Sequence, residues 1–167
     1  MSIDLEASKE SSNVVSMNGS SVLLVEDDSN DVLFIRRAFL RANPTIEIQI
    51  VKDGDAAVDY LSGTGEFSDR DRYPLPGLIL LDLKLPRRSG IEVLQWIRQK
   101  EAIKRIPVVI LTSSRERLDV DLSYDLGVNS YLVKPVSFDD LSTMVESLNA
   151  YWIGLNEYPT VTLADQS

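Results

Sequence analysis

Apolar and polar positions along the chain predict five strands, each followed by a helix, between residues 21 and 152. Short runs of aliphatic and β-branched residues are typical of strands, and the run before Asp82 holds four consecutive aliphatic residues. Such a run is expected for a parallel strand that is buried on both faces. In chain order, the predicted strands lie in the segments SVLLVEDD, TIEIQIV, GLILLD, PVVILTSS and NSYLVKP.

The segments between these runs carry apolar residues at helical spacing. Ser29 is the expected N-cap of the first helix, because a serine hydroxyl can accept a hydrogen bond from the first helical turn. Asp28 is expected to cap or to be solvated rather than to bind a ligand. The predicted helices cover roughly 29–41, a stretch that begins at 53, then 89–101, 115–126 and 139–151.

Regular alternation of strand and helix predicts an α/β fold with helices on both faces of a parallel sheet. Crossover connections are nearly always right-handed, which favours a doubly wound, flavodoxin-like (βα)5 sheet in the order 2-1-3-4-5. We expect a mobile N-terminal tail over residues 1–20, one domain over 21–152 and a C-terminal tail over 153–167. The polar stretch 62–76 is expected to be a surface loop.

The amino-acid composition excludes several classes of function and partner. The 17 basic and 26 acidic residues give a net charge of −9, which argues against nucleic acid or an anionic membrane as a partner. The chain has no cysteine and no histidine, so thiolate catalysis, Ser-His-Asp triads and Cys or His metal sites are excluded. No apolar run approaches the ~20 residues of a membrane span, and a cytoplasmic protein is expected.

Reactive side chains follow the predicted strands. Glu26 and Asp27 follow the first strand, and Asp82 ends the third. Because strands one and three are neighbours in the predicted order, these acids should meet at one edge of the sheet. Thr112 and Lys134, at the ends of the fourth and fifth strands, should approach from the other side.

Three carboxylates in one pocket repel one another. A pair ~4 Å apart costs about 4 kcal/mol at an effective dielectric constant of ~20, so a lysine, raised pKa values or a cation must offset the repulsion. A site made only of oxygen ligands suits Mg²⁺ best and Mn²⁺ second. Together with a hydroxyl and an ammonium group, such a pocket fits one phosphoryl group, with a carboxylate that attacks phosphorus.

Four segments resemble the successive signatures of the response-regulator receiver family of two-component signalling. They are VLLVEDD, LILLDLKLPRRSG, VVILTSS and YLVKPV, and they occur in the family's order over roughly residues 21 to 152. The most specific is the pattern D-x-x-L-P-x-x-x-G, which begins at Asp82 and ends at Gly90. One mild departure is Glu26, which stands where many members have an aspartate.

The resemblance implies roles for the acidic residues. Asp82 would be the phosphoacceptor, and Glu26 and Asp27 would position Mg²⁺. Asp27 is expected to be a direct ligand, whereas the longer Glu26 would reach the metal through a water molecule. The backbone carbonyl of Lys84 would complete the metal shell.

Three further residues match the family's signalling machinery. Thr112 would be the switch hydroxyl, Lys134 the lysine that pairs with the phosphoryl group, and Tyr131 the switch aromatic residue. The family usually joins Lys134 and Pro135 by a cis peptide bond, which is therefore expected here as well.

By this resemblance the protein is a single-domain response regulator rather than a turnover enzyme. It would take a phosphoryl group from a partner histidine kinase onto Asp82, in a reaction that depends on Mg²⁺ and that it catalyses itself. It would then hydrolyse the acyl phosphate slowly and switch a protein-interaction face. An alternative is an intermediate phosphate carrier in a multi-step phosphorelay.

Other classes fit less well. An aspartyl phosphatase needs a D-x-D pattern, and Lys84 stands at the second acidic position. A flavin binder needs a first βα turn rich in Ser, Thr or Gly, and this turn is acidic. A receiver-like scaffold that is never phosphorylated would have no need of the complete acceptor set.

Output is expected through protein contact, because residues after 152 are too few for a DNA-binding module. The fourth predicted helix has two apolar faces. One can pack on the sheet, and the other is expected to be exposed to solvent. Together with the wide apolar stripe of the last helix, this predicts a homodimer through helix four, strand five and helix five. The segments SYDLGVNSYLVKPV and YWIGLNEYP also resemble stand-alone regulators that accompany phytochrome kinases, so a phytochrome-type sensor is the expected partner.

Overall fold

The computed structural model describes residues 14–15 and 18–162, and its centre is a five-stranded parallel sheet. The strand order is β3-β2-β4-β5-β6, which is the predicted order 2-1-3-4-5 for the five sheet strands. All four pairings are parallel. The strands are β2 (Asn18–Val25), β3 (Glu47–Val51), β4 (Pro76–Leu81), β5 (Val108–Thr112) and β6 (Ser130–Val133).

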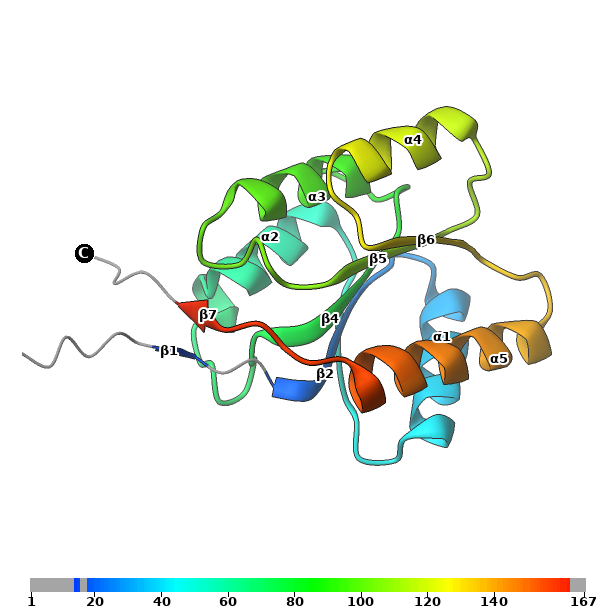
Figure 1. Ribbon diagram of the computed structural model, residues 1–167, viewed down its shortest axis with the longest axis horizontal. Coiled ribbons are helices and arrows are strands. Elements are labelled where there is room, and N and C mark those ends of the chain that lie inside the picture. The colour runs from blue at the N-terminus through cyan, green and yellow to red at the C-terminus, as the bar shows by residue number, and fades with distance from the viewer. Residues whose placement is uncertain (1–13, 16–17, 163–167) are drawn as a thin grey trace, which may run out of the picture.

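Helices cover both faces of this sheet, with α1 and α5 on one face and α2, α3 and α4 on the other (Figure 1). Within the described residues, none of the helices combines the length and the apolar character needed to cross a bilayer. The α-helices are α1 (Ser29–Ala42), α2 (Gly54–Ser62), α3 (Gly90–Gln99), α4 (Arg117–Asp125) and α5 (Phe138–Leu148). A 3₁₀ turn η1 (Gly65–Phe67) lies in the expected surface loop, and a π-helix η2 (Asn149–Leu155) continues α5.

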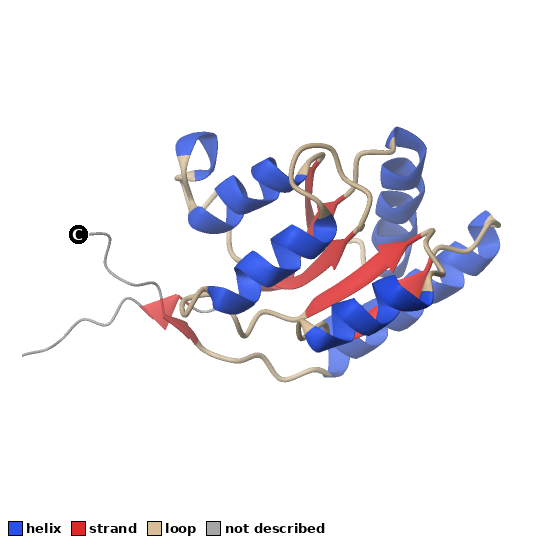
Figure 2. Ribbon diagram, turned by 90° about the horizontal axis from the view of Figure 1, so that it is seen from above, coloured by secondary structure: helices blue, strands red, loops and turns tan. Residues whose placement is uncertain are grey.

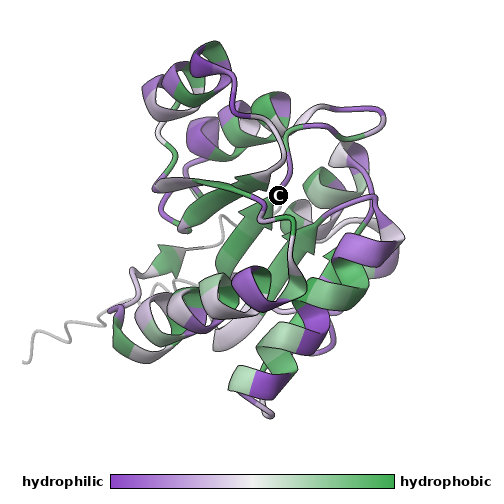
Figure 3. Ribbon diagram, turned by 90° about the vertical axis from the view of Figure 1, so that its right-hand side faces the viewer, coloured by the Kyte–Doolittle hydropathy of each residue, from purple (hydrophilic) through white to green (hydrophobic). Residues whose placement is uncertain are grey.

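Alternate residues of the central strands enter two separate apolar cores. Leu23 and Ile79 pack with α2 and α3, whereas Val22 and Leu78 pack with α1 and α5. Every residue of β4 and β5 is buried, which explains their unbroken aliphatic sequences. Hydrophobic colour accordingly fills the strands, whereas the helices alternate between hydrophobic and hydrophilic residues (Figure 3).

Two helix starts differ from the sequence-based expectation. Asp28, not Ser29, caps α1, because its carboxylate accepts hydrogen bonds from the backbone N–H groups of Asn30 and Asp31. Of the two roles expected for Asp28, capping or solvation, the structure thus shows capping. Helix α4 begins at Arg117, later than expected, and its only buried residue is Ser123.

The expected packing of one apolar face of α4 on the sheet is wrong. Leu118 and Leu122 are 81% and 44% exposed, and Tyr124, on the other side of the helix, is 52% exposed. A small serine at the contact brings this helix close to the strands with little apolar burial. Helix α4 therefore leaves large apolar side chains in solvent on more than one side.

The first and last described strands pair with each other near the amino end of the sheet. Strand β2 begins at Asn18, before the expected start at Ser21, and β1 (Val14–Val15) pairs antiparallel with β7 (Val161–Thr162). This ribbon lies outside the main sheet and inside the two segments that were expected to be tails (Figure 2). The division into tail, domain and tail stays a prediction, and residues 1–13, 16–17 and 163–167 lie outside the described part.

Candidate functional site

The candidate residues sit where the sheet strands end. Backbone pairing continues past the strands, since the N–H of Asp82 donates to the carbonyl of Val25 at 3.1 Å. In the same way, the N–H of Lys134 donates to the carbonyl of Thr112 at 2.8 Å. The parallel register therefore fixes the backbone of each site residue relative to the neighbouring strand, as the topology predicted.

The structure brings Glu26, Asp27 and Asp82 together at one edge of the sheet. One carboxylate oxygen from each residue lies within 4.8 Å of the others. Glu26 and Asp82 are buried, at 1% and 6% exposed, whereas Asp27 is exposed. The cluster thus consists of two buried carboxylates and one that is exposed to solvent.

Lys134 is the cation of this cluster. Its Nζ lies 2.6 Å from Oε2 of Glu26 and 2.7 Å from Oδ2 of Asp82, and its side chain is 12% exposed. Buried carboxylates need such a partner, because charges that are removed from water without one are strongly destabilising. The structure thus places Lys134 beside the acids, on the side of the site where the sequence expected it.

Sequence reasoning missed one member of the site. Asp31, in the first turn of α1, places Oδ2 at 2.8 Å from Nζ of Lys134. It lies in the first helical turn after an acidic strand end, and an acid at that position was the available signal.

Burial and the lysine act in opposite directions on the acids. Burial raises the pKa of Glu26 to about 7, and the nearby Asp82 adds to this effect. Burial also opposes ionisation of Asp82, but hydrogen bonds from Lys134 and Glu26 outweigh it and hold the pKa of Asp82 below its ordinary value. Burial would lower the pKa of Lys134, yet its bonds to carboxylates raise it. Asp82 is therefore the stronger acid of the pair.

A short network connects the site to α4. Thr112 is fully buried, and its Oγ1 accepts a hydrogen bond of 3.4 Å from the N–H of Ser114. The hydroxyl of Tyr131 donates to the carbonyl of Ser114 at 2.9 Å, and Oγ of Ser114 donates to Asp119 at 2.6 Å. The loop between β5 and α4 is therefore held both by the strand and by the helix.

The loop after Asp82 is closely packed. The N–H of Lys84 donates to Oδ1 of Asp82 at 3.2 Å, so this residue touches the acceptor through its backbone. A Cβ on Gly90 would lie 2.1 Å from the Asp82 carbonyl oxygen, so only glycine fits there. Arg87 adopts a left-handed φ of 64°, which is strained for a residue with a side chain.

The expected cis bond between Lys134 and Pro135 is wrong. The described residues contain no cis peptide bond, so this one is trans. The trans form is the intrinsically favoured state of such a bond.

The donor set fits a hard divalent cation. Glu26, Asp27 and Asp82 supply only oxygen atoms, and the cluster combines buried and solvent-facing carboxylates. Mg²⁺ prefers such ligands and keeps several of its waters, which the exposed side of the site allows. Lys134 neutralises only part of the negative charge, so a cation would relieve the repulsion that remains.

Comparison with known proteins places this geometry in a family. Residues 22–146 match the model of the response regulator receiver domain. The probable methanogenesis regulatory protein FilR2 of Methanothrix harundinacea is 44% identical over 138 residues, which cover 83% of this chain and 86% of FilR2. Response regulator Rcp1 of Synechocystis is 42% identical over 142 residues, covering 85% of this chain and 91% of Rcp1.

Solved structures agree with these sequence relatives. The phosphorylated cyanobacterial phytochrome response regulator RcpA is 37% identical, with a TM-score of 0.79, over 83% of this chain and 97% of RcpA. The Mn²⁺-bound form of Rcp1 is 40% identical, with a TM-score of 0.76, over 83% of this chain and 98% of that one. The sheet order, the acidic cluster and these matches together show that the chain belongs to the response-regulator receiver family.

Proposed function

We propose that the protein is a stand-alone response regulator that accepts a phosphoryl group on Asp82 from a histidine kinase, with Mg²⁺ as the cofactor. The observation that carries this proposal is the environment of Asp82. It is a buried carboxylate that is bonded to Lys134 and lies beside two other acids. Such a carboxylate is a nucleophile held in place, and its partners can stabilise the charge of an incoming phosphoryl group.

The transfer replaces one bond to phosphorus with another. A carboxylate oxygen of Asp82 forms a P–O bond while the P–N bond to the kinase histidine breaks, and the electron pair stays on the imidazole, which takes up a proton. Bound Mg²⁺ would supply positive charge to the phosphoryl oxygens. Lys134 would pair with another of these oxygens, and the Thr112 hydroxyl would donate to a third.

The signal would leave through the loop between β5 and α4. A donor bond from Thr112 to a phosphoryl oxygen would draw the end of β5 toward Asp82. Ser114 would move with it, and the hydroxyl of Tyr131 would lose its present acceptor, the Ser114 carbonyl. Tyr131 could then turn inward, and the face formed by α4, β6 and α5 would change shape.

The relatives support a phytochrome-type kinase as the partner. RcpA is a phytochrome response regulator, and the match to it extends over nearly its whole length. Kinases that such regulators serve would place this protein in the cytoplasm.

Labelling tests the proposal directly. With Mg²⁺ and acetyl phosphate, or with a phosphorylated histidine kinase, we expect one phosphoryl group on the wild-type protein and none on Asp82→Asn, since the amide cannot act as the nucleophile. Intact mass spectrometry measures the added mass. Asp139→Asn, a matched change of an exposed acid on α5, should label like the wild type. Label on Asp82→Asn equal to that of the wild type would contradict the assignment.

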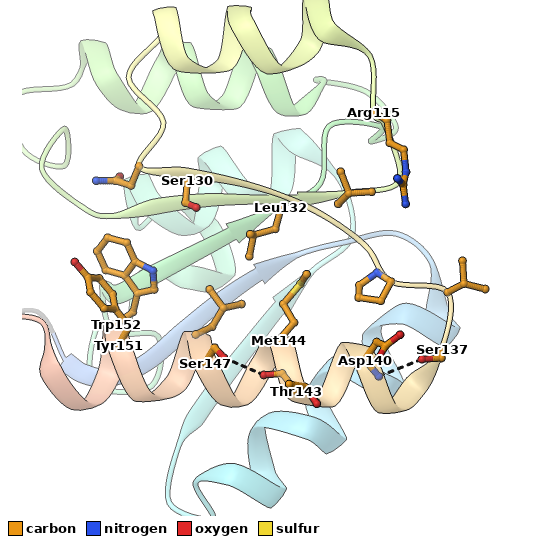
Figure 4. A pocket seen from close by; sticks show the side chains of 15 residues that line it. Arg115, Ser130, Leu132, Ser137, Asp140, Thr143, Met144, Ser147, Tyr151 and Trp152 are labelled. Carbon is orange, nitrogen blue, oxygen red and sulfur yellow. Dashed lines mark hydrogen bonds between the residues drawn. The ribbon is translucent and has the colours of Figure 1, made fainter.

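We also propose a homodimer through α4, β6 and α5. A groove of about 1,080 Å³ runs between the edge strand β6 and α5, and Leu132, Met144 and Trp152 line it (Figure 4). Leu118 and Leu122 on α4 expose further apolar surface beside the edge strand. A second copy of the chain would cover these side chains, and burial of apolar area favours that association.

A further inference from the structure

Asp31 is a carboxylate partner of Lys134 that the proposed phosphoryl transfer does not use. Its side chain is 35% exposed, compared with 2% for Glu26 and 7% for Asp82. Among the described residues, the cluster of metal-ligating oxygens contains Glu26, Asp27 and Asp82 but not Asp31. Asp31 therefore lies outside the group that could hold a metal ion, and its partner is the lysine.

The first turn of α1 holds Asp31 in place. The carboxylate of Asp28 caps this helix and accepts the backbone N–H of Asp31 at 2.9 Å. A negative side chain at this end of a helix is also favoured by the helix dipole. The carboxylate of Asp31 is thus a charged group on a rigid element, directed at Lys134.

Lys134 has no hydrogen left for a new partner. An ammonium group donates three hydrogen bonds, and its Nζ lies within 2.8 Å of three carboxylates, those of Glu26, Asp31 and Asp82. A phosphoryl group on Asp82 would add three acceptor oxygens to the site. Lys134 can bond one of them only if it leaves one of its present partners.

Asp31 is the partner that can be released at least cost. Water can replace the lysine at an exposed carboxylate, whereas Glu26 would be left buried without its cation. The contact between Asp31 and Lys134 is therefore the exchangeable one of the three.

We infer that Asp31 is a positioning residue that holds Lys134 toward α1 in the unphosphorylated protein and competes with the phosphoryl group for it. The inference rests on the proposed function of Asp82. Removing the carboxylate of Asp31 frees one ammonium hydrogen in advance, so the site binds a phosphoryl group more tightly and reacts faster with a small phosphodonor.

The test compares Asp31→Asn and Asp31→Ala with the wild type. For both variants we expect a rate of labelling by acetyl phosphate with Mg²⁺ that is higher by about 1.5-fold to fivefold, the range for loss of one partly exposed ion pair. Asp31→Ala should exceed Asp31→Asn, because the amide oxygen can still accept a weak hydrogen bond. The control is Asp139→Asn, which removes an exposed acid from the first turn of α5. It should label at the wild-type rate.

A binding measurement separates positioning from a merely structural role. Beryllofluoride with Mg²⁺ mimics a phosphoryl group, and its affinity is measured by titration followed by NMR. The inference requires that both Asp31 variants bind beryllofluoride more tightly, by a factor similar to their gain in labelling rate, even if their melting temperatures change. If affinity and labelling rate are unchanged or reduced in both variants, the inference is wrong. If the wild type is still labelled, the proposed phosphorylation of Asp82 stands and only the role of Asp31 is wrong. If the wild type is not labelled, both proposals are wrong.

Discussion

Lys134 carries the charge on which the whole acidic cluster depends. Its Nζ contacts two nearly buried carboxylates, those of Glu26 and Asp82, and the partly exposed Asp31. Removal of one member of a buried ion pair leaves the other without compensation, which costs far more than the loss of a surface pair. The stability of the site without metal therefore depends on one side chain.

Lys134→Met should lower the free energy of unfolding by about 3 kcal/mol in the absence of divalent cations, because Glu26 and Asp82 lose their counter-ion. Addition of Mg²⁺ should raise the melting temperature of this variant more than that of the wild type, because the cation replaces the missing charge. Chemical denaturation and thermal melting with EDTA or with Mg²⁺ measure both effects.

Lys104→Met is the matched control. Its Nζ contacts Glu101 at 2.8 Å at the protein surface, where ion pairs contribute little. We expect little change in stability and no added response to Mg²⁺. An equal loss in the two lysine variants would show that the acidic cluster does not depend on Lys134.

At the level of elements, the loop between β4 and α3 sets the position of the acceptor. Gly90 begins α3 directly against the backbone of Asp82 and Leu83, and its N–H donates to the carbonyl of Leu83 at 3.0 Å. Ser89 and Glu92 form a capping box that fixes the start of the same helix. Helix α3 and the end of β4 therefore pack as one rigid corner.

Gly90→Ala should destabilise the protein by about 2–3 kcal/mol, because the added methyl group meets backbone atoms that cannot turn away. The corner must open to admit it, so labelling of Asp82 should also be slower. Denaturant unfolding and the labelling rate measure the two effects.

Gly154→Ala provides the comparison for the same chemical change. A Cβ at Gly154 would lie 3.8 Å from the Asn149 carbonyl oxygen, which is an ordinary contact. We expect little or no loss of stability and normal labelling. If both alanine variants behave alike, close packing at Gly90 does not control the acceptor loop.

At the level of the whole molecule, apolar side chains line the face formed by α4, β6 and α5. The groove between β6 and α5 is lined by Leu132 and Trp152, and α4 adds Leu118 at 81% exposed. The Thr112 and Tyr131 network connects the acidic cluster to the same face. Phosphorylation and association are therefore expected to be coupled.

Light scattering should show a mass that rises with concentration from 18.7 kDa toward twice that value, and beryllofluoride should shift the rise to lower concentration. Leu118→Glu should weaken the association, because it places a charge in the proposed interface. Leu40→Glu on α1, which changes an exposed leucine outside this face, should behave as the wild type does. A monomer mass at all concentrations, with and without beryllofluoride, would refute the dimer.

The order of the sheet and the meeting of the three acids could be predicted from the sequence. Unbroken aliphatic runs identified buried parallel strands, and parallel strands bring Glu26, Asp27 and Asp82 to one edge. Capping or solvation was expected for Asp28, and the structure shows capping, whereas the N-cap predicted at Ser29 was one residue too late. The predictions that succeeded depend on neighbouring residues or on strand order alone.

Other features depended on contacts between distant segments. The exposure of α4, the ribbon of β1 and β7, and the bond between Asp31 and Lys134, which are 103 residues apart, are set by packing that no local pattern reports. The sequence by itself determined which strands form and which acids meet, since backbone pairing and strand polarity follow from local hydrophobic patterns. Only the tertiary structure decided which carboxylates share the lysine and which apolar faces stay open, because those outcomes depend on distances across the fold.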